Sequence, residues 1–135
     1  MKVLDHIGIA VQSLEQKRAF YAALGVTVEG GEEVASQKVR VAFLPVEGTR
    51  LELLEPTAPE SPIAKFIEKR GEGLHHLCFR VDDVRAAMAG LREKGYTLLS
   101  EEPQPGAHGA LVCFVHPKSS GGVLIELSQP GEGHP

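Results

Sequence analysis

The feature that most constrains this chain is an internal repeat. The segment LDHIGIAVQS in the first half returns as LHHLCFRVDD in the second half, 70 residues later. In that frame His6 matches His76, and Gly25 matches Gly95. Because one offset relates both the strand-like segments and the glycines that follow them, the chain is predicted to contain two copies of one folding unit.

A second echo lies at the end of each copy. The segment RLELLEP matches LIELSQP, which aligns Glu52 with Glu126 at a spacing of 74 residues. The second copy has therefore gained four residues between its histidine and its glutamate. Each copy supplies one histidine early and one glutamate late.

Composition narrows the class of protein. The chain has 135 residues, 42% of them hydrophobic, and a net charge of −4 without a run of basic residues, so nucleic-acid binding is not expected. No segment is typical of a signal peptide, and no apolar run is long enough for a membrane span. Cys78 and Cys113 lie in strand-like segments and are predicted to be reduced, buried thiols. A single cytoplasmic domain is expected.

In the first copy the pattern predicts a strand, a helix and three strands. Alternation from Val3 to Val11 is typical of a strand with two different faces. Ser13 followed by Gln16 favours a helix start, and Gly25 favours its end. This helix is expected to bury four residues: Leu14, Phe20, Ala23 and Leu24. The three strands are expected at residues 26–34, 38–46 and 50–55.

A linker helix and the second copy follow. Ser61 and Pro62 are typical of the start of a short helix, so module 1 is assigned to about residues 3–56 and the linker helix to about 57–72. Module 2, at about 73–130, opens with a strand and continues with a helix capped by Asp83. Its later strands are expected at residues 96–100, 110–115 and 123–127. The tail, 131–135, is expected to be flexible. The fold class is α+β, with two paired βαβββ modules forming an open, barrel-like sheet around a cleft.

Four metal-binding side chains occupy equivalent positions of the repeat: His6, Glu52, His76 and Glu126. If a pseudo-twofold axis relates the modules, all four can converge on that axis. Two imidazoles and two carboxylates suit a divalent transition metal. A single strand histidine is more often structural than a ligand, but the repeat makes chance a poor explanation for four such residues.

At this point the sequence resembles the vicinal-oxygen-chelate superfamily (glyoxalases, bleomycin-resistance proteins and dioxygenases) and, within it, the methylmalonyl-CoA epimerases. The resemblance covers about residues 4–130 and rests on LDHIGIAV, LELLEP with SPIAKF, GLHHLCFRVDD, and GAHG with FVHPKSSGGVLIELSQP. It implies paired βαβββ modules around a metal held by His6, Glu52, His76 and Glu126. The implied metal is Co²⁺, with Mn²⁺, Ni²⁺, Zn²⁺ and Fe²⁺ as alternatives.

The resemblance also implies a reaction. A metal-stabilised enolate would allow the α-proton of methylmalonyl-CoA to be removed and returned on the opposite face, which interconverts the R and S forms. Glu126 and Glu52 are the expected bases. Some members carry another glutamate on the third strand of module 1, where this chain has Val41. A homodimer acting on an acyl-CoA in propionate metabolism is implied. The candidate substrate contacts are His108, Lys118 and Ser119.

Other members of the superfamily offer competing functions. A glyoxalase-I-like isomerase (lactoylglutathione lyase) would use the same ligands. A ring-cleaving dioxygenase would need two histidines and one glutamate, so Glu52 argues against it. A drug-binding relative would usually carry aromatic stacking residues, and this chain has no tryptophan and two tyrosines.

Overall fold

The computed structural model describes residues 3–131, whose contacts separate two units. One unit contains residues 6–75, and the other contains residues 3–5 with 76–131. The predicted flexible tail lies, apart from residue 131, outside the described residues. Within residues 3–131 no helix combines the length and the apolar character that crossing a membrane would require.

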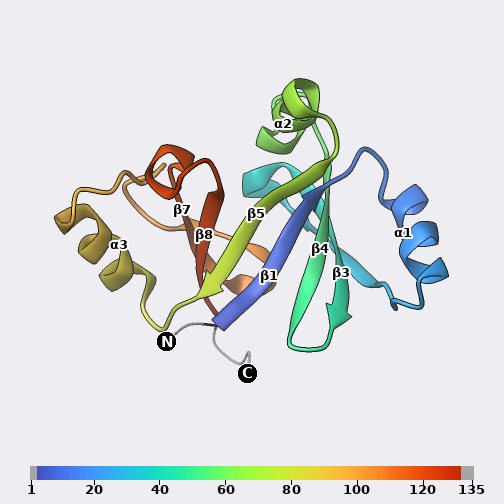
Figure 1. The fold of residues 1–135 in the computed structure, drawn as a ribbon, viewed down its shortest axis with the longest axis horizontal. Coiled ribbons are helices and arrows are strands. Elements are labelled where there is room, and N and C mark those ends of the chain that lie inside the picture. The colour runs from blue at the N-terminus through green and yellow to red at the C-terminus, as the bar shows by residue number, and fades with distance from the viewer. Residues whose placement is uncertain (1–2, 132–135) are drawn as a thin grey trace. The chain divides into compact units, whose positions relative to one another are not determined.

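The unit of residues 6–75 contains the first βαβββ module, apart from the first three residues of β1, and the linker helix (Figure 1). In its sheet the strands follow the order β2-β3-β4-β1. Strand β4 is antiparallel to β3 but parallel to β1, so the last strand of the module returns beside the first. The elements are β1 (Val3–Ala10), α1 (Leu14–Ala23), β2 (Glu29–Val34), β3 (Val39–Val46), β4 (Thr49–Pro56) and α2 (Pro62–Arg70).

The helix boundaries confirm the capping residues expected from the sequence. The side chains of Ser13, Ser61 and Asp83 each accept a hydrogen bond from a backbone N–H in the first turn of their helices. Gly25 and Gly95 follow α1 and α3 with φ of 88° and 89°, a conformation that glycine adopts without steric cost. The repeat therefore extends to the way both module helices begin and end.

The buried face of α1 differs from the expected one. Leu14 is 5% exposed and belongs to the core, whereas Phe20 and Leu24 are 56% and 61% exposed. Tyr21, two turns after Leu14, packs against that core. The helix therefore contacts the core through residues seven apart, and Ala23, also expected to be buried, is exposed. The buried core residues of this unit are Val11, Leu14, Ala42, Leu44 and Leu53.

The second unit contains the second βαβββ module, with strand order β5-β8-β7-β6. Strand β8 is parallel to β5 and antiparallel to β7. The first module has the same arrangement, with β4 parallel to β1 and antiparallel to β3. Val84 and Met88 of α3 are buried with Cys113 of β7. The elements are β5 (Gly73–Arg80), α3 (Val84–Glu93), β6 (Gln104–Pro105), β7 (Leu111–Val115) and β8 (Leu124–Gln129).

The strand predicted at residues 96–100 was wrong. That segment makes one isolated bridge, from Leu98 to Val115, and the strand that pairs with β7 is the two-residue β6. Pro103 precedes β6 and Pro105 is its second residue, and proline cannot donate to a strand ladder, which keeps the edge strand short. Three short 3₁₀ helices were also not expected: Ala35–Gln37, Ala107–Gly109 and Pro117–Ser120.

Candidate metal and catalytic site

Strand pairing brings a histidine and a glutamate together in each module. Glu52 of β4 lies opposite Gly8 of β1, and Glu126 of β8 lies opposite Cys78 of β5. Gly8 and Cys78 each come two residues after a histidine, which is His6 in the first module and His76 in the second. Because side chains alternate along a strand, residues two apart share a face, and the histidine and glutamate of each module project to the same side.

In the first unit the pair is His6 and Glu52. His6 Nδ1 lies 3.2 Å from Glu52 Oε2, and both residues are buried, with 5% and 4% of their surface exposed. Arg50, two residues before the glutamate, reaches the same oxygen with Nε at 2.8 Å and Nη2 at 2.7 Å. The buried carboxylate therefore has a cation beside it, which offsets the cost of removing its charge from water.

In the second unit the pair is His76 and Glu126. His76 Nε2 lies 2.9 Å from Glu126 Oε1, and both residues are as buried as their counterparts. The ring of Phe114 meets the His76 ring edge-on, at 6.0 Å between centroids. Phe114 is the strand partner of Glu126, as Phe43 is of Glu52. Each carboxylate thus lies between its histidine strand and an aromatic residue.

The structure shows one residue near these pairs that the sequence reasoning missed. Arg50 and Glu52 are two apart in a strand, so the alternation of β4 places them on one face. That spacing was a signal for an ion pair. The sequence alone did not show that the guanidinium would reach the same carboxylate oxygen as His6.

The tentative substrate residues lie in two short turns of the second unit. Lys118 and Ser119 belong to Pro117–Ser120, where Ser119 Oγ accepts a hydrogen bond from the Thr97 amide at 3.1 Å. His116 caps this turn, since its Nδ1 accepts from the Lys118 amide. His108 lies in the other turn with φ of 56°, a strained value for a residue with a side chain.

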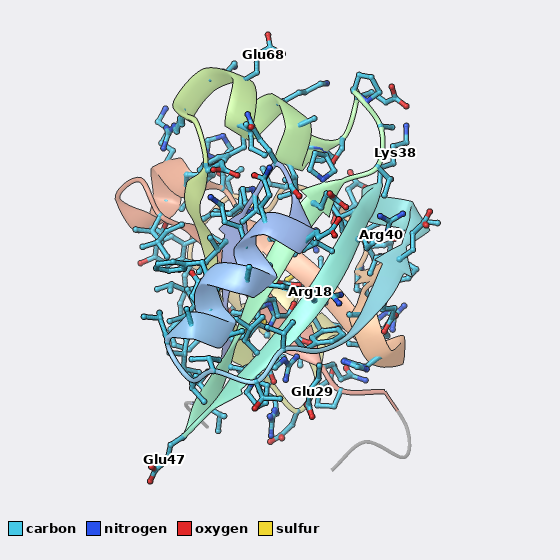
Figure 2. The ribbon with its side chains drawn as sticks, turned by 90° about the vertical axis from the view of Figure 1, so that its right-hand side faces the viewer. Arg18, Glu29, Lys38, Arg40, Glu47 and Glu68 are labelled. Carbon is cyan, nitrogen blue, oxygen red and sulfur yellow. The ribbon has the colours of Figure 1, made fainter. Side chains whose placement is uncertain are left out.

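Two basic residues of the first unit, Lys38 and Arg40, form ion pairs with glutamates. Lys38 Nζ lies 3.3 Å from Glu60, and Arg40 lies 3.1 Å from Glu55. Figure 2 shows Lys38 and Arg40 on the outer side of their unit. Both side chains are about half exposed, and such surface pairs contribute roughly 0–1 kcal/mol, so either cation can exchange its partner at little cost.

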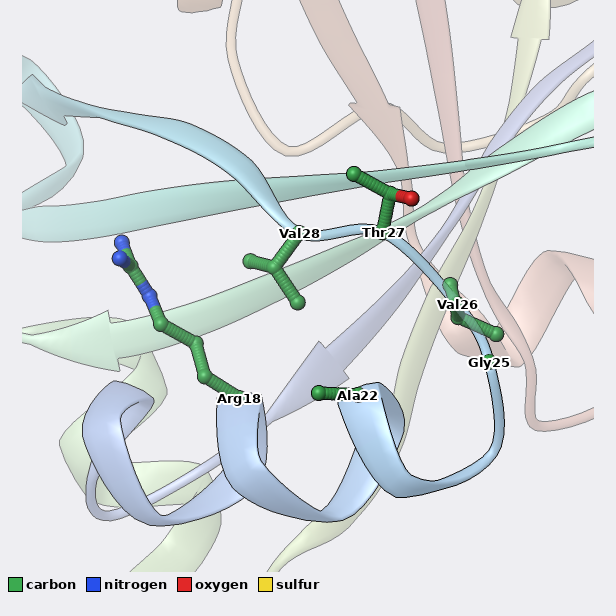
Figure 3. Close-up of a pocket in the computed structure, with 6 residues that line it drawn as sticks. All are labelled: Arg18, Ala22, Gly25, Val26, Thr27 and Val28. Atoms are coloured by element: carbon green, nitrogen blue, oxygen red, sulfur yellow. The ribbon is translucent and has the colours of Figure 1, made fainter.

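A pocket of about 360 Å³ lies between α1 and the segment that follows it, and neither His6 nor Glu52 lines it (Figure 3). Arg18 and Ala22 line it from the helix, and Val26 and Val28 line it from the segment that leads to β2. Its lining is aliphatic except for Arg18 and Thr27, and no acid or base suited to proton transfer is among the residues that form it.

Cys113 is buried beside the glutamate strand and allows a test of the environment of the second unit. Burial raises the pKa of the Cys113 thiol to about 11, and the charge of Glu126 adds to the rise. In the unfolded chain the thiol ionises at its lower, ordinary pKa. The unfolded state therefore loses this proton first as the pH rises, and folding stability falls between the two values.

We predict that the fall in folding stability caused by ionisation of the Cys113 thiol is absent from the variant Cys113→Ala. Between about pH 9 and 11 the wild-type free energy of unfolding should fall more steeply than that of the variant, by up to about 1.4 kcal/mol per pH unit. Urea denaturation of both proteins across this range measures the difference in slope. Parallel curves would contradict the raised pKa, whatever the absolute cost of the substitution.

The chain is similar to known proteins over most of its length. Residues 5–114 match the Glyoxalase/Bleomycin resistance protein/Dioxygenase superfamily. The chain is 44% identical to the mitochondrial methylmalonyl-CoA epimerase of Homo sapiens over 128 residues, which cover 93% of this chain and 73% of that protein. It is 43% identical to the ethylmalonyl-CoA/methylmalonyl-CoA epimerase of Cereibacter sphaeroides, covering 93% of this chain and 96% of that protein.

A solved structure agrees with these relatives. The chain matches a methylmalonyl-CoA epimerase in complex with methylmalonyl-CoA and NH4⁺ with a TM-score of 0.92 and 39% identity, covering 98% of this chain and 96% of that one. The expected α+β class and paired βαβββ modules are confirmed. The chain therefore belongs to the glyoxalase/bleomycin-resistance/dioxygenase superfamily and, within it, to the family of methylmalonyl-CoA epimerases.

Proposed function

We propose that this chain interconverts the R and S forms of methylmalonyl-CoA by moving the proton on the carbon between the thioester and the carboxylate. The observation that carries the proposal is the buried histidine–glutamate pair in each module. The relatives named above are epimerases of this substrate, and one of them is a complex with it. A histidine–glutamate pair in each half suits a reaction in which a proton leaves one face of a carbon and returns to the opposite face.

We propose further that the two pairs together bind one divalent metal through His6, Glu52, His76 and Glu126. The donors fit such an ion, since imidazole nitrogens and carboxylate oxygens are ligands of divalent transition metals and two carboxylates can balance its charge. Co²⁺ is the preferred ion, with Mn²⁺, Ni²⁺, Zn²⁺ and Fe²⁺ as alternatives. When bound, the ion would act as a Lewis acid toward the thioester carbonyl and so help stabilise the enolate.

The chain's own carboxylates are the candidates for moving the proton. We assign this step to Glu126, which is buried and held next to His76, where a general base can be kept close to the substrate. Glu52 occupies the equivalent place in the other module. The position where some relatives carry a further glutamate is Val41, a core residue that is 2% exposed. No acid at that position can assist.

The assembly and location follow as part of the same proposal. We propose a homodimer, supported by the exposed Phe20 and Leu24 on α1. We propose that it works in the cytoplasm, in propionate metabolism, which agrees with the buried thiols of Cys78 and Cys113. Light scattering of the purified chain measures the mass, and a monomer at micromolar concentration would remove the dimer from the proposal.

Deuterium exchange tests the function directly. The Co²⁺-loaded protein is incubated in D2O with one epimer of methylmalonyl-CoA, and deuterium at the α-carbon is followed together with the epimer ratio. We expect rapid incorporation accompanied by racemisation. A glutathione hemithioacetal, assayed in parallel, tests the glyoxalase-like alternative. Turnover of the hemithioacetal without exchange of the CoA ester would overturn the proposal.

A further inference from the structure

The two modules differ at the position two residues before each glutamate. In the second module Leu124 is the strand partner of His76 and stands two residues before Glu126. In the first module the residue two before the glutamate is Arg50. The repeat therefore places a guanidinium next to one glutamate and an aliphatic side chain next to the other.

The contacts of Arg50 restrain Glu52 closely. Two nitrogens of the guanidinium approach Oε2 of Glu52 at 2.8 and 2.7 Å, the range of charge-assisted hydrogen bonds. His6 Nδ1 reaches the same oxygen at 3.2 Å. The guanidinium also lies over the ring of Phe43, 5.8 Å from its centroid, which limits where it can move. The carboxylate is thus held through one of its two oxygens.

We propose that Arg50 is a positioning residue that keeps Glu52 in a fixed orientation as a metal ligand. This inference rests on the proposed metal site and narrows the role of Glu52 within it. A carboxylate that binds a metal works best when its orientation is held, and the two nitrogens of Arg50 hold Glu52 in this way. Leu124, at the equivalent position of the second module, has an aliphatic side chain that cannot make such contacts.

The burial of the Arg50 side chain agrees with this role. About 29% of it is exposed, against 5% for the side chain of Glu52, so the ion pair is screened less than a surface pair. Groups that orient a metal ligand from outside typically change metal affinity 10–100-fold when removed. Repulsion acts in the opposite direction. The positive charge of Arg50 repels a bound metal ion, so removing that charge would, by itself, tighten metal binding. The sign of the effect therefore separates positioning from simple repulsion.

The test compares Co²⁺ binding to wild type, Arg50→Leu and Arg50→Lys, measured by calorimetry and by the visible spectrum of the bound ion without substrate. Leucine copies the second module. Lysine keeps the charge but replaces the two-nitrogen contact with one ammonium group. We expect Arg50→Leu to bind roughly 10–100-fold more weakly with an altered spectrum, and Arg50→Lys to fall between it and wild type.

Arg40→Leu is the matched control, since it removes an arginine from an exposed pair with Glu55 on the same sheet and should leave Co²⁺ binding unchanged. Circular dichroism and thermal melts establish that all three variants are folded. Equal or tighter Co²⁺ binding by Arg50→Leu would overturn the inference while leaving the function intact. Wild type that binds Co²⁺ but exchanges no substrate proton would instead refute the epimerase function, and the Arg50 comparison would still decide the positioning role.

Discussion

Replacing Glu126 with glutamine is expected to remove most of the α-proton exchange and leave the fold unchanged. Glutamine has nearly the same shape and can still meet His76, whose Nε2 lies 2.9 Å from the glutamate oxygen, but an amide cannot accept the substrate proton. A positioned general base typically contributes 10²–10⁴-fold to the rate. The exchange rate in D2O should therefore fall by about that factor.

The control for this substitution is Glu101→Gln, an exposed glutamate of the same unit, which should exchange at the wild-type rate. Thermal melts and Co²⁺ titrations of both variants separate loss of the base from loss of the fold or of the metal. If Glu126→Gln bound Co²⁺ normally and exchanged the α-proton as fast as wild type, Glu126 would not be the base.

Removing the metal is expected to abolish exchange and also to destabilise the protein. The four donors belong to two buried histidine–glutamate pairs, and an ion that binds only the folded chain adds its binding free energy to stability. At a free concentration 100 times the dissociation constant, this amounts to about 2.7 kcal/mol. For a chain of this size such a change corresponds to roughly 10 °C in melting temperature.

This prediction is tested by chelation, desalting and stepwise return of Co²⁺, with exchange and melting temperature followed together. Both should recover at the same metal concentration. His76→Ala, which removes one donor, should show a much smaller shift on adding Co²⁺, and Ca²⁺ should not replace Co²⁺, because it prefers oxygen ligands. Full exchange by the stripped protein would show that the reaction needs no metal.

The repeat predicted the two modules and placed His6, Glu52, His76 and Glu126 at matching positions. The structure adds that each histidine contacts the glutamate of its own module, on one face of the paired strands. The caps of the helices followed from local chemistry in the same way. These features depend on neighbours in sequence or on strand register, both of which the amino-acid pattern carries.

What the sequence could not predict depends on contacts chosen in three dimensions. Leu14, Phe20 and Leu24 of α1 are equally apolar, and only packing decides that the first is buried while the others are exposed. The strand expected at residues 96–100 had suitable residues, but it makes only an isolated bridge with the end of β7, and the two-residue β6 forms the regular ladder with the start of β7. The reach of Arg50 to Glu52 depends on side-chain conformation, to which strand periodicity is blind.

In each module the last strand pairs in parallel with the first, so the position of its glutamate does not depend on the length of the chain between them. Glu126 is held opposite Cys78 by the ladder between β8 and β5, as Glu52 is held opposite Gly8 in the shorter first module. The four additional residues of the second copy leave that pairing unchanged. Segments between the helix and the final strand can therefore differ in length without moving the glutamate away from the strand that carries the histidine.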